Sequence, residues 1–314
     1  RPRLQGCLRV AAFELLEALE SGSVPERGPK IIDHAVGAIR RSLSRGEAGL
    51  ANAVLRKLPA VLEQKRRDGP PHQRLSLPEW LWNRWATAFG AEAAEAIAAA
   101  CLEPSPWTLR WRSKTEPPPP DLPATHWPGF HDASGLPHAR VAAWLGQGTA
   151  YAQDPSTRLS VEALDVRPGE SVLDLCAAPG GKALLIVDAL GEDPAGRLVA
   201  VDKPGPRISR LDENLRKLDS GDGPGVELLV ADILDTSPDA FGIFDAVLLD
   251  APCSNTGVVR RRPDVKWRLT EAAIAEVAAL QSALLAKAAG CVRPGGRVVY
   301  STCSIEADEN HAVV

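Results

Sequence analysis

Apolar residues recur at helical spacing along the first 75 residues of the chain. In residues 4–20 they stand three or four positions apart, and the same spacing returns in residues 31–43 and 50–58. This period is typical of amphipathic helices that bury one face. We therefore predict an all-α domain over residues 1–72, which ends at the Gly-Pro-Pro sequence of residues 69–71.

The next segment changes character twice. A helix is expected to begin at Pro78, with its apolar side running as far as Cys101. We expect its tryptophans (Trp80, Trp82 and Trp85) to pack in a core rather than to stack on bases. Residues 104–148 are rich in proline and tryptophan and show no regular period. Residues 73–149 are therefore assigned to a helical and Pro-rich connector subdomain.

From residue 150 onward, short apolar runs alternate with helical patterns. The runs lie at residues 171–175, 197–202, 226–231, 244–250 and 296–302. This alternation predicts a parallel sheet with helices on its faces. Residues 150–314 should therefore form an α/β Rossmann-like domain, and the residues before Val314 have the pattern of a further helix.

Composition is that of a globular protein, with 45% hydrophobic and 24% charged residues. No apolar run approaches the roughly 18 residues of a membrane span, and no signal-peptide pattern opens the chain. The six cysteines form no CxxC pair, and no histidine stands near one at ligand spacing. We expect a cytoplasmic protein that binds neither a metal nor a membrane.

Charge is unevenly distributed along the chain. The net charge is −4, yet residues 1–75 carry an excess of Lys and Arg, while residues 150–314 carry an excess of Asp and Glu. A basic N-terminal domain on an acidic body fits a polyanionic partner held at one end. Solvated helix faces would give the same distribution.

A glycine turn follows the first strand of the α/β domain. Its residues are Cys176, Ala177, Ala178, Pro179, Gly180, Gly181 and Lys182. A turn of this kind allows a ligand to approach the backbone and the N-terminus of the next helix. A phosphate-binding P-loop would need Gly at 176 and Ser or Thr at 183, where the chain has Cys176 and Ala183.

Acidic residues stand at the ends of the following strands. They are Asp202, Asp232 and Asp250. A carboxylate after the second strand can accept the hydroxyls of a ribose, and one after the third can reach an adenine amino group. Together with the glycine turn they describe a pocket for a nucleoside without a pyrophosphate. S-adenosylmethionine fits this description.

Two cysteines follow the ends of the last two strands. Cys253 lies in Asp-Ala-Pro-Cys-Ser, and Cys303 lies in Ser-Thr-Cys-Ser. The ends of neighbouring parallel strands face a common crevice, so two thiols beside the carboxylate of Asp250 suggest covalent chemistry on an electrophile. Two buried packing cysteines are the alternative.

These motifs resemble those of a known family. AAPGGK (177–182), DAPCSNTG (250–257) and PGGRVVYSTCS (294–304) are similar to the signatures of the RsmB/Sun family of RNA cytosine-5 methyltransferases. The segment GLANAVLRKL (49–58) is similar to the NusB-like helical domain of its RsmB/Sun branch. The resemblance implies a class I methyltransferase domain preceded by a NusB-like RNA-binding domain and the small connector.

The resemblance also implies roles for individual residues. Cys303 would be the nucleophile that adds to C6 of cytosine, which turns C5 into an enamine carbon able to attack a methyl group. Cys253 would assist release of the methylated RNA. In DNA cytosine-5 methyltransferases a Pro-Cys motif supplies the nucleophile, which would instead select Cys253. Asp250 would bind the base, and Lys182 would orient Asp250 or the thiolate. The S-adenosylmethionine site would comprise residues 176–182 with Asp202, Asp232 and Asp250.

A basic segment follows Cys253 directly. It contains Arg260, Arg261, Arg262, Lys266, Trp267 and Arg268. A basic loop with an aromatic residue can hold phosphates and stack a base of an opened RNA strand. Solvated surface charge is the alternative. The target base must also leave its stack, because C5 and C6 are approached face-on.

We therefore expect a monomeric enzyme that methylates C5 of a cytosine in small-subunit (16S) ribosomal RNA. A tRNA cytosine-5 methyltransferase and a non-catalytic RNA-binding protein on the same scaffold are the alternatives. A methyltransferase sheet of this family continues beyond the Thr-Cys-Ser strand with a helix and two strands. The sequence ends at Val314, so we expect those strands to be missing.

Overall fold

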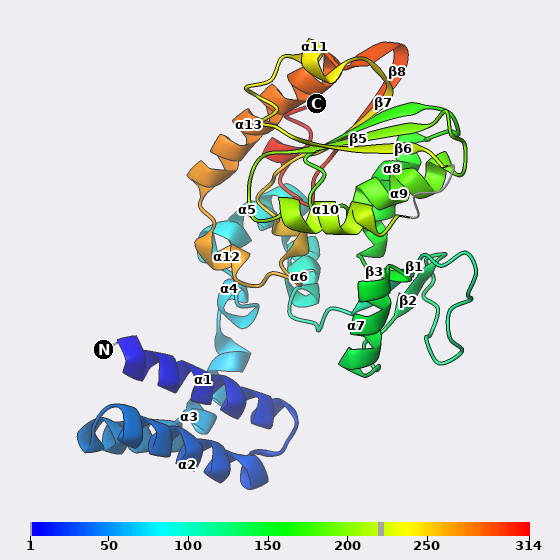
Figure 1. Cartoon of the computed structure of the whole chain (residues 1–314). Coiled ribbons are helices and arrows are strands. Elements are labelled where there is room, and N and C mark those ends of the chain that lie inside the picture. The colour runs from blue at the N-terminus through cyan, green and yellow to red at the C-terminus, as the bar shows by residue number, and fades with distance from the viewer. Residues whose placement is uncertain (1, 219–222) are drawn as a thin grey trace. The chain divides into compact units, whose positions relative to one another are not determined.

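The structure is a computed structural model that describes residues 2–218 and 223–314 (Figure 1). Its chain divides into two compact units, Arg1–Ala98 and Ala99–Val314. The three-part division at residues 72 and 149 is finer than this partition and stays a prediction.

The first unit consists of helices. They are α1 (Pro2–Glu20), α2 (Val24–Ser42), α3 (Arg45–Asp68), α4 (Pro71–Arg74), α5 (Glu79–Phe89) and α6 (Ala91–Ala100), whose last residues enter the second unit. The helical spacing read from the sequence corresponds to the buried stripe, since Leu15, Ile39 and Leu55 are fully buried.

The single helix expected from Pro78 to Cys101 is wrong in one respect. Gly90 has a φ of +83°, a left-handed conformation that ends α5 and separates it from α6. Glycine adopts this conformation without the steric cost that a Cβ imposes. Trp82 and Trp85 are buried as expected, and Trp80 is half-buried.

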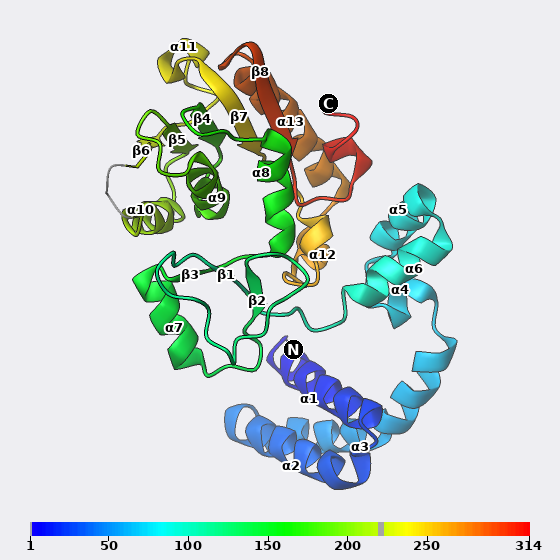
Figure 2. The same ribbon diagram turned by 90° about the vertical axis from the view of Figure 1, so that its right-hand side faces the viewer.

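The proline-rich segment forms a small antiparallel sheet. Its strands are β1 (Thr108–Trp111), β2 (Phe130–Asp132) and β3 (Ala150–Ala152) in the order β2-β1-β3, with helix α7 (His138–Gln147) packed on them (Figure 2). Arg110 of β1 and Arg112, which follows β1, both pair with Asp188 of helix α9 (Gly181–Leu190). These ion pairs attach the small sheet to a helix that packs on the larger sheet.

The larger sheet has five parallel strands in the order β6-β5-β4-β7-β8. They are β4 (Ser171–Leu175), β5 (Arg197–Asp202), β6 (Gly225–Val230), β7 (Phe244–Asp250) and β8 (Val292–Ser301). The five expected strands and the Rossmann-like fold are confirmed. Because the chain moves outward from β4 in one direction and then in the other, a crevice opens at the carboxyl ends of the strands beside β4.

Helices cover both faces of this sheet. The helical elements are η1 (Pro155–Thr157), α8 (Arg158–Leu164), α9 (Gly181–Leu190), α10 (Ile208–Arg216), α11 (Pro238–Phe241), η2 (Thr256–Val258), α12 (Val265–Arg268), α13 (Glu271–Ala289) and η3 (Ala307–Glu309). On one face, α8 and α9 pack on Val172 and Leu248. On the other, α13 packs on Leu173 and Leu249. The side chains of alternate residues in each strand therefore point to opposite faces of the sheet.

Two helical segments differ from expectation. The residues after Cys303 form the short 3₁₀ helix η3 and turns, where the sequence pattern predicted an α-helix. Helix α13 is long and apolar enough, by length and composition, to cross a membrane. Leu284 and Ala288 of α13 pack against the sheet, and 22% of its apolar stretch is buried.

Core packing gives a first test. Leu173 is fully buried, so Leu173→Ala should lower the free energy of unfolding of the second unit by about 2–5 kcal/mol. Leu159→Ala on α8 is the matched control, because Leu159 is 50% exposed and should change this free energy by less than about 0.5 kcal/mol. Equilibrium urea unfolding measures both. Equal losses in the two variants would contradict the assigned core.

Candidate active site

The glycine turn lies between β4 and α9. Cys176 has a φ of +64° and Gly180 a φ of +107°, and together they turn the chain so that α9 begins at Gly181. The N-terminus of this ten-residue helix points its first N–H groups towards the carboxyl ends of the strands. It is therefore placed to receive the negative end of a ligand. Burial and the acids around Cys176 raise the pKa of its thiol to about 12, so it is not poised as a nucleophile.

The three predicted acids occupy different environments. Asp202 is 5% exposed and accepts hydrogen bonds from the backbone N–H groups of Ala178 (2.9 Å) and Lys203 (2.8 Å). It therefore braces the glycine turn. Asp232 is exposed and accepts a bond from the N–H of Leu234 at 3.0 Å. Asp250 is half-buried at the end of β7.

A fourth acid, Asp174, was missed by the sequence analysis. It is fully buried on β4, and within the described part of the chain neither oxygen has a hydrogen-bond partner. Burial, with the negative charges of Asp250 and Asp202, raises its pKa well above the usual range. Its position in an apolar strand could have signalled it. The side chains of Asp202 and Asp250 at the same edge of the sheet, opposed by Lys182, favour a cationic ligand, and the sulfonium and ammonium groups of S-adenosylmethionine fit.

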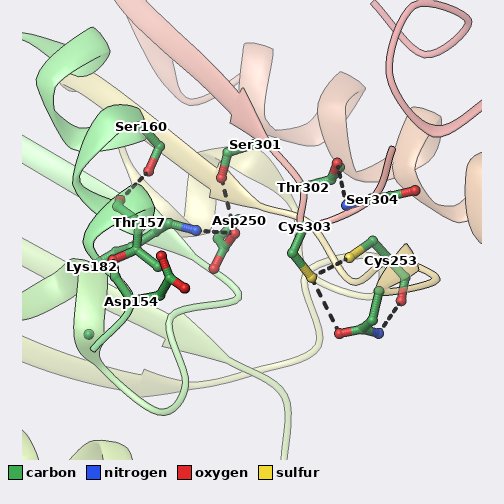
Figure 3. A network of polar contacts seen from close by, with 12 residues as sticks. Asp154, Thr157, Ser160, Lys182, Asp250, Cys253, Ser301, Thr302, Cys303 and Ser304 are labelled. Atoms are coloured by element: carbon green, nitrogen blue, oxygen red, sulfur yellow. Dashed lines mark hydrogen bonds and ion pairs between the residues drawn. The ribbon is translucent and has the colours of Figure 1, made fainter. Parts of the chain in front are cut away.

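Lys182 reaches across from α9 to the next strand. Its Nζ forms an ion pair with Oδ1 of Asp250, and the same oxygen accepts a hydrogen bond from Oγ of Ser301 at 3.0 Å (Figure 3). A lysine and a serine thus fix this carboxylate at the end of β7. Such a carboxylate can accept a hydrogen bond from a base.

The two cysteines meet as the sequence predicts. Sγ of Cys253 lies 3.0 Å from Sγ of Cys303, and both thiols are free (Figure 3). The Cys303 thiol also lies 3.3 Å from Oδ1 of Asn255, whose Nδ2 donates to the carbonyl of Cys253 at 2.7 Å. Asn255 was not predicted, although it follows Cys253 by two residues in the DAPCSNTG motif. It fixes both cysteine loops.

The thiol pair titrates unequally. The hydrogen bond from Cys303 lowers the pKa of Cys253, and the same bond with burial raises the pKa of Cys303. Two groups this close release their protons in two separate steps. The first proton is lost easily and the second is held, so the pair can carry one thiolate that is shared across 3.0 Å.

A buried carboxylate holds the two cysteine loops together. Glu309 is fully buried; its Oε2 accepts from the N–H of Ser254 (2.8 Å) and from Gln281 (3.0 Å), and its Oε1 accepts from Ser304 (2.6 Å). Ser254 follows Cys253, and Ser304 follows Cys303. The sequence analysis missed Glu309 because it assigned this segment to an ordinary helix.

The predicted RNA-binding residues divide into two groups. Arg260 donates to the backbone carbonyls of Glu103 and Pro104, and Arg261 pairs with Asp154 at 2.6 Å. These two arginines fasten the loop to neighbouring segments of the same unit. Arg262 is exposed, as is Trp267, which is 59% exposed.

The remaining two basic residues differ from each other. Arg268 is exposed and pairs with Asp264 at 2.5 Å. Lys266 is 4% exposed, and burial lowers the pKa of its amine. Its ammonium lies 5.6 Å from the ring centre of Trp267. A buried amine does not reach a phosphate at the surface, so Lys266 is set apart from the predicted RNA surface.

Within residues 2–218 and 223–314, no group of three or more His, Cys, Asp or Glu side chains has the arrangement of a metal site.

Comparisons with known proteins agree with this geometry. The family described as 16S rRNA methyltransferase RsmB/F matches residues 161–314. Ribosomal RNA small subunit methyltransferase B of Erwinia tasmaniensis is 35% identical over 288 residues, which cover 85% of this chain and 63% of that protein. The chain thus spans less than two thirds of the length of this relative.

A relative and a solved structure extend the similarity over the whole chain. The probable ribosomal RNA small subunit methyltransferase B of Bacillus subtilis is 31% identical, with 100% of this chain and 72% of that protein covered. The crystal structure of PH0851 has the same fold, with a TM-score of 0.76 at 24% identity over 100% of this chain and 72% of its own. By these similarities, the chain belongs to the RsmB/F family of 16S rRNA methyltransferases.

Proposed function

We propose that this chain methylates C5 of a cytosine in small-subunit (16S) ribosomal RNA through a covalent cysteine–C6 intermediate. The observation that carries the proposal is the 3.0 Å approach of Cys253 and Cys303 at the ends of adjacent parallel strands. The fixed carboxylate of Asp250 stands beside them. Family membership supports the substrate class, and the free thiols suit the reducing cytoplasm.

In the first step the Cys253 thiolate takes the proton of Cys303 across the 3.0 Å between the sulfurs, and the Cys303 thiolate formed in this way adds to C6 of the flipped cytosine. The new S–C6 bond moves the C5–C6 electron pair onto C5, which becomes a nucleophile. Asp250 accepts a hydrogen bond from the base edge, and Lys182 keeps Asp250 in place. Cytosine offers an N4–H₂ donor where uracil has an acceptor. A carboxylate at this position therefore selects cytosine.

The second step forms the C5–methyl bond. S-adenosylmethionine, when bound, supplies an electrophilic methyl group on a sulfonium. The methyl–sulfur bond of the cofactor would break in this transfer, and the cofactor would leave as a neutral thioether. The C5 proton then passes to water, which returns an electron pair to the C5–C6 bond and expels the Cys303 thiolate. Cys253 stabilises this leaving thiolate by donating an S–H hydrogen bond across the 3.0 Å between the sulfurs. The product is released with its ring restored.

Residues of the glycine turn and the strand ends would hold the cofactor. The N-terminus of α9 would receive its carboxylate, Asp202 its ribose and Asp232 its adenine. The acidic surroundings of Asp174 would stabilise its positive charges. The exposed Arg262, Trp267 and Arg268 would contact the RNA strand, acting with the NusB-like domain of a monomer.

Trapping of the product complex tests the proposal. Cys253→Ala should accumulate a covalent RNA adduct in the presence of S-adenosylmethionine and cellular RNA, because the thiolate of Cys303 leaves slowly. Cys303→Ala should form no adduct and should lower methyl transfer by roughly 10⁴-fold or more. A denaturing gel detects the adduct, and sequencing of the trapped RNA identifies the cytosine.

The control for this trapping experiment is Cys291→Ala, which removes a buried thiol just before β8, at the opposite end of that strand from Cys303. This variant should transfer methyl groups to RNA at the wild-type rate. If Cys303→Ala forms the adduct and Cys253→Ala does not, then Cys253 is the nucleophile and Cys303 assists release. Intact RNA binding with no methyl transfer to any RNA, in the wild type, would instead favour a non-catalytic RNA-binding protein.

The unequal thiols give a pH-dependent prediction. Thiolate is the reactive form, so alkylation of Cys253 by iodoacetamide should rise with pH around a midpoint below that of an ordinary thiol. Cys303→Ala removes the S–H donor and leaves burial, which raises the pKa of Cys253, so the midpoint should move to higher pH. Peptide mass spectrometry between about pH 6 and pH 10 measures this. An unchanged midpoint would contradict a shared proton.

A further inference from the structure

A cavity of about 420 Å³ is lined in part by residues 257–261, which follow Cys253 in the chain. Four segments of the second unit surround it: residues 105–108, 125–132, 154–156 and 257–261. Its volume is within the range of pockets that hold one small ligand. Neither the proposed cofactor site nor the proposed cytosine site uses it.

Gly257 forms the wall between this cavity and the catalytic cysteines. Its N–H donates to the carbonyl of Cys303 at 3.0 Å, and a Cβ on Gly257 would lie 2.9 Å from that oxygen. Backbone therefore packs directly on backbone here. Gly257 thus lines the cavity and contacts the backbone of Cys303, which places the cavity next to the segment that carries this cysteine.

One side of the cavity is aromatic. His126 is exposed and Trp127 is half-buried, and their ring centres lie 5.1 Å apart with the planes tilted by 45°. The Trp127 loop is rigid, because Oγ1 of Thr125 accepts from the N–H of Trp127 at 3.1 Å and donates to the carbonyl of Phe130 at 3.0 Å. A fixed indole beside an exposed imidazole offers a stacking surface for a planar ring.

The other lining groups are polar or charged. Oγ of Ser105 is buried and, among the residues that the structure describes, has no hydrogen-bond partner. A buried hydroxyl without a partner is costly unless a ligand or water satisfies it. Two aspartates, Asp132 and Asp154, line the cavity together with Arg260 and Arg261, and Arg261 is paired with Asp154. Stacking, a free hydroxyl and the guanidinium group of Arg260 together match the base, the ribose and the phosphate of a nucleotide.

We propose that this cavity binds the nucleotide next to the target cytosine in the RNA strand. The inference rests on the proposed function and deepens it. The flanking base stacks on Trp127, and Ser105 bonds to its ribose or base edge. Arg260 faces its phosphate with the terminal nitrogen that does not donate to Glu103 or Pro104, while Arg261 stays paired with Asp154. When the flanking nucleotide occupies the cavity, its base no longer stacks on the target cytosine. The target cytosine therefore stays unstacked in front of Cys303. Trp127 and Ser105 are thus specificity-determining residues.

The test uses small-subunit ribosomal RNA made by splinted ligation, with the site identified by trapping. Two further RNAs lack the base on the 5′ or the 3′ side of the target cytosine. With the wild type, kcat/KM should fall by about 5- to 100-fold on one of these two RNAs, because a stacked base is lost. Trp127→Ala should lose a similar factor on intact RNA. It should then show no further loss on that same abasic RNA.

Trp144→Ala is the matched control, because Trp144 of α7 packs on Trp111 of the small sheet and does not line the cavity. It should keep the wild-type response to the missing base. Ser105→Ala provides a second, milder variant that removes a single hydroxyl. It should lower kcat/KM on intact RNA by several-fold, and binding of S-adenosylmethionine should be unchanged in all variants.

Three results would overturn the proposal. Equal behaviour of Trp127→Ala and Trp144→Ala would remove the stacking role. Full and additive losses of Trp127→Ala on both abasic RNAs would mean that Trp127 does not meet either flanking base. A wild type that methylates no RNA would overturn the proposed function itself, which distinguishes that failure from failure of the cavity assignment.

Discussion

The parallel pairing of β7 with β8 is the constraint on which the site depends. Its register sets Asp250 opposite Ser301, and the two chains then leave the sheet side by side. Cys253 and Cys303 follow these strand ends by two or three residues, so fifty residues of separation become 3.0 Å. A shift of one residue would turn Asp250 to the other face of the sheet. The strand order β6-β5-β4-β7-β8 brings the glycine turn to the same edge.

The strand register alone does not fix the positions of the two cysteine loops. Buried polar groups that follow the strands fix them. Glu309 accepts hydrogen bonds from both cysteine loops and from Gln281 of α13, while Asn255 bridges the cysteines themselves. Such a network is stable because its buried carboxylate is fully bonded. It holds the sulfurs close enough to share a proton. One thiol can then activate or release the other as the reaction requires.

Much of this arrangement could be predicted from the sequence, because short buried strands and glycine turns leave strong local patterns. The five strands and the paired cysteines followed from the motifs and the topology of parallel sheets. For Lys182 the family resemblance left two partners open, Asp250 or the thiolate, and the structure has Asp250. Long-range polar pairing leaves no such pattern. Glu309 stands in a segment with helical periodicity, and Asp174 in an apolar strand. The small sheet was hidden because its strands have only three or four residues each. Their pairing partners lie far apart in the chain.

The central claim is that Cys303 forms the bond to the base. Ribosomal RNA that contains 5-fluorocytidine tests it in the wild-type protein, because fluorine at C5 cannot leave as the proton does and the adduct should persist. After reaction with S-adenosylmethionine and digestion by nuclease and protease, mass spectrometry locates the modified peptide. We expect the methylated fluorocytidine on Cys303. Its attachment to Cys253, or an unmodified Cys303 and Cys253 in the presence of bound RNA, would contradict the account.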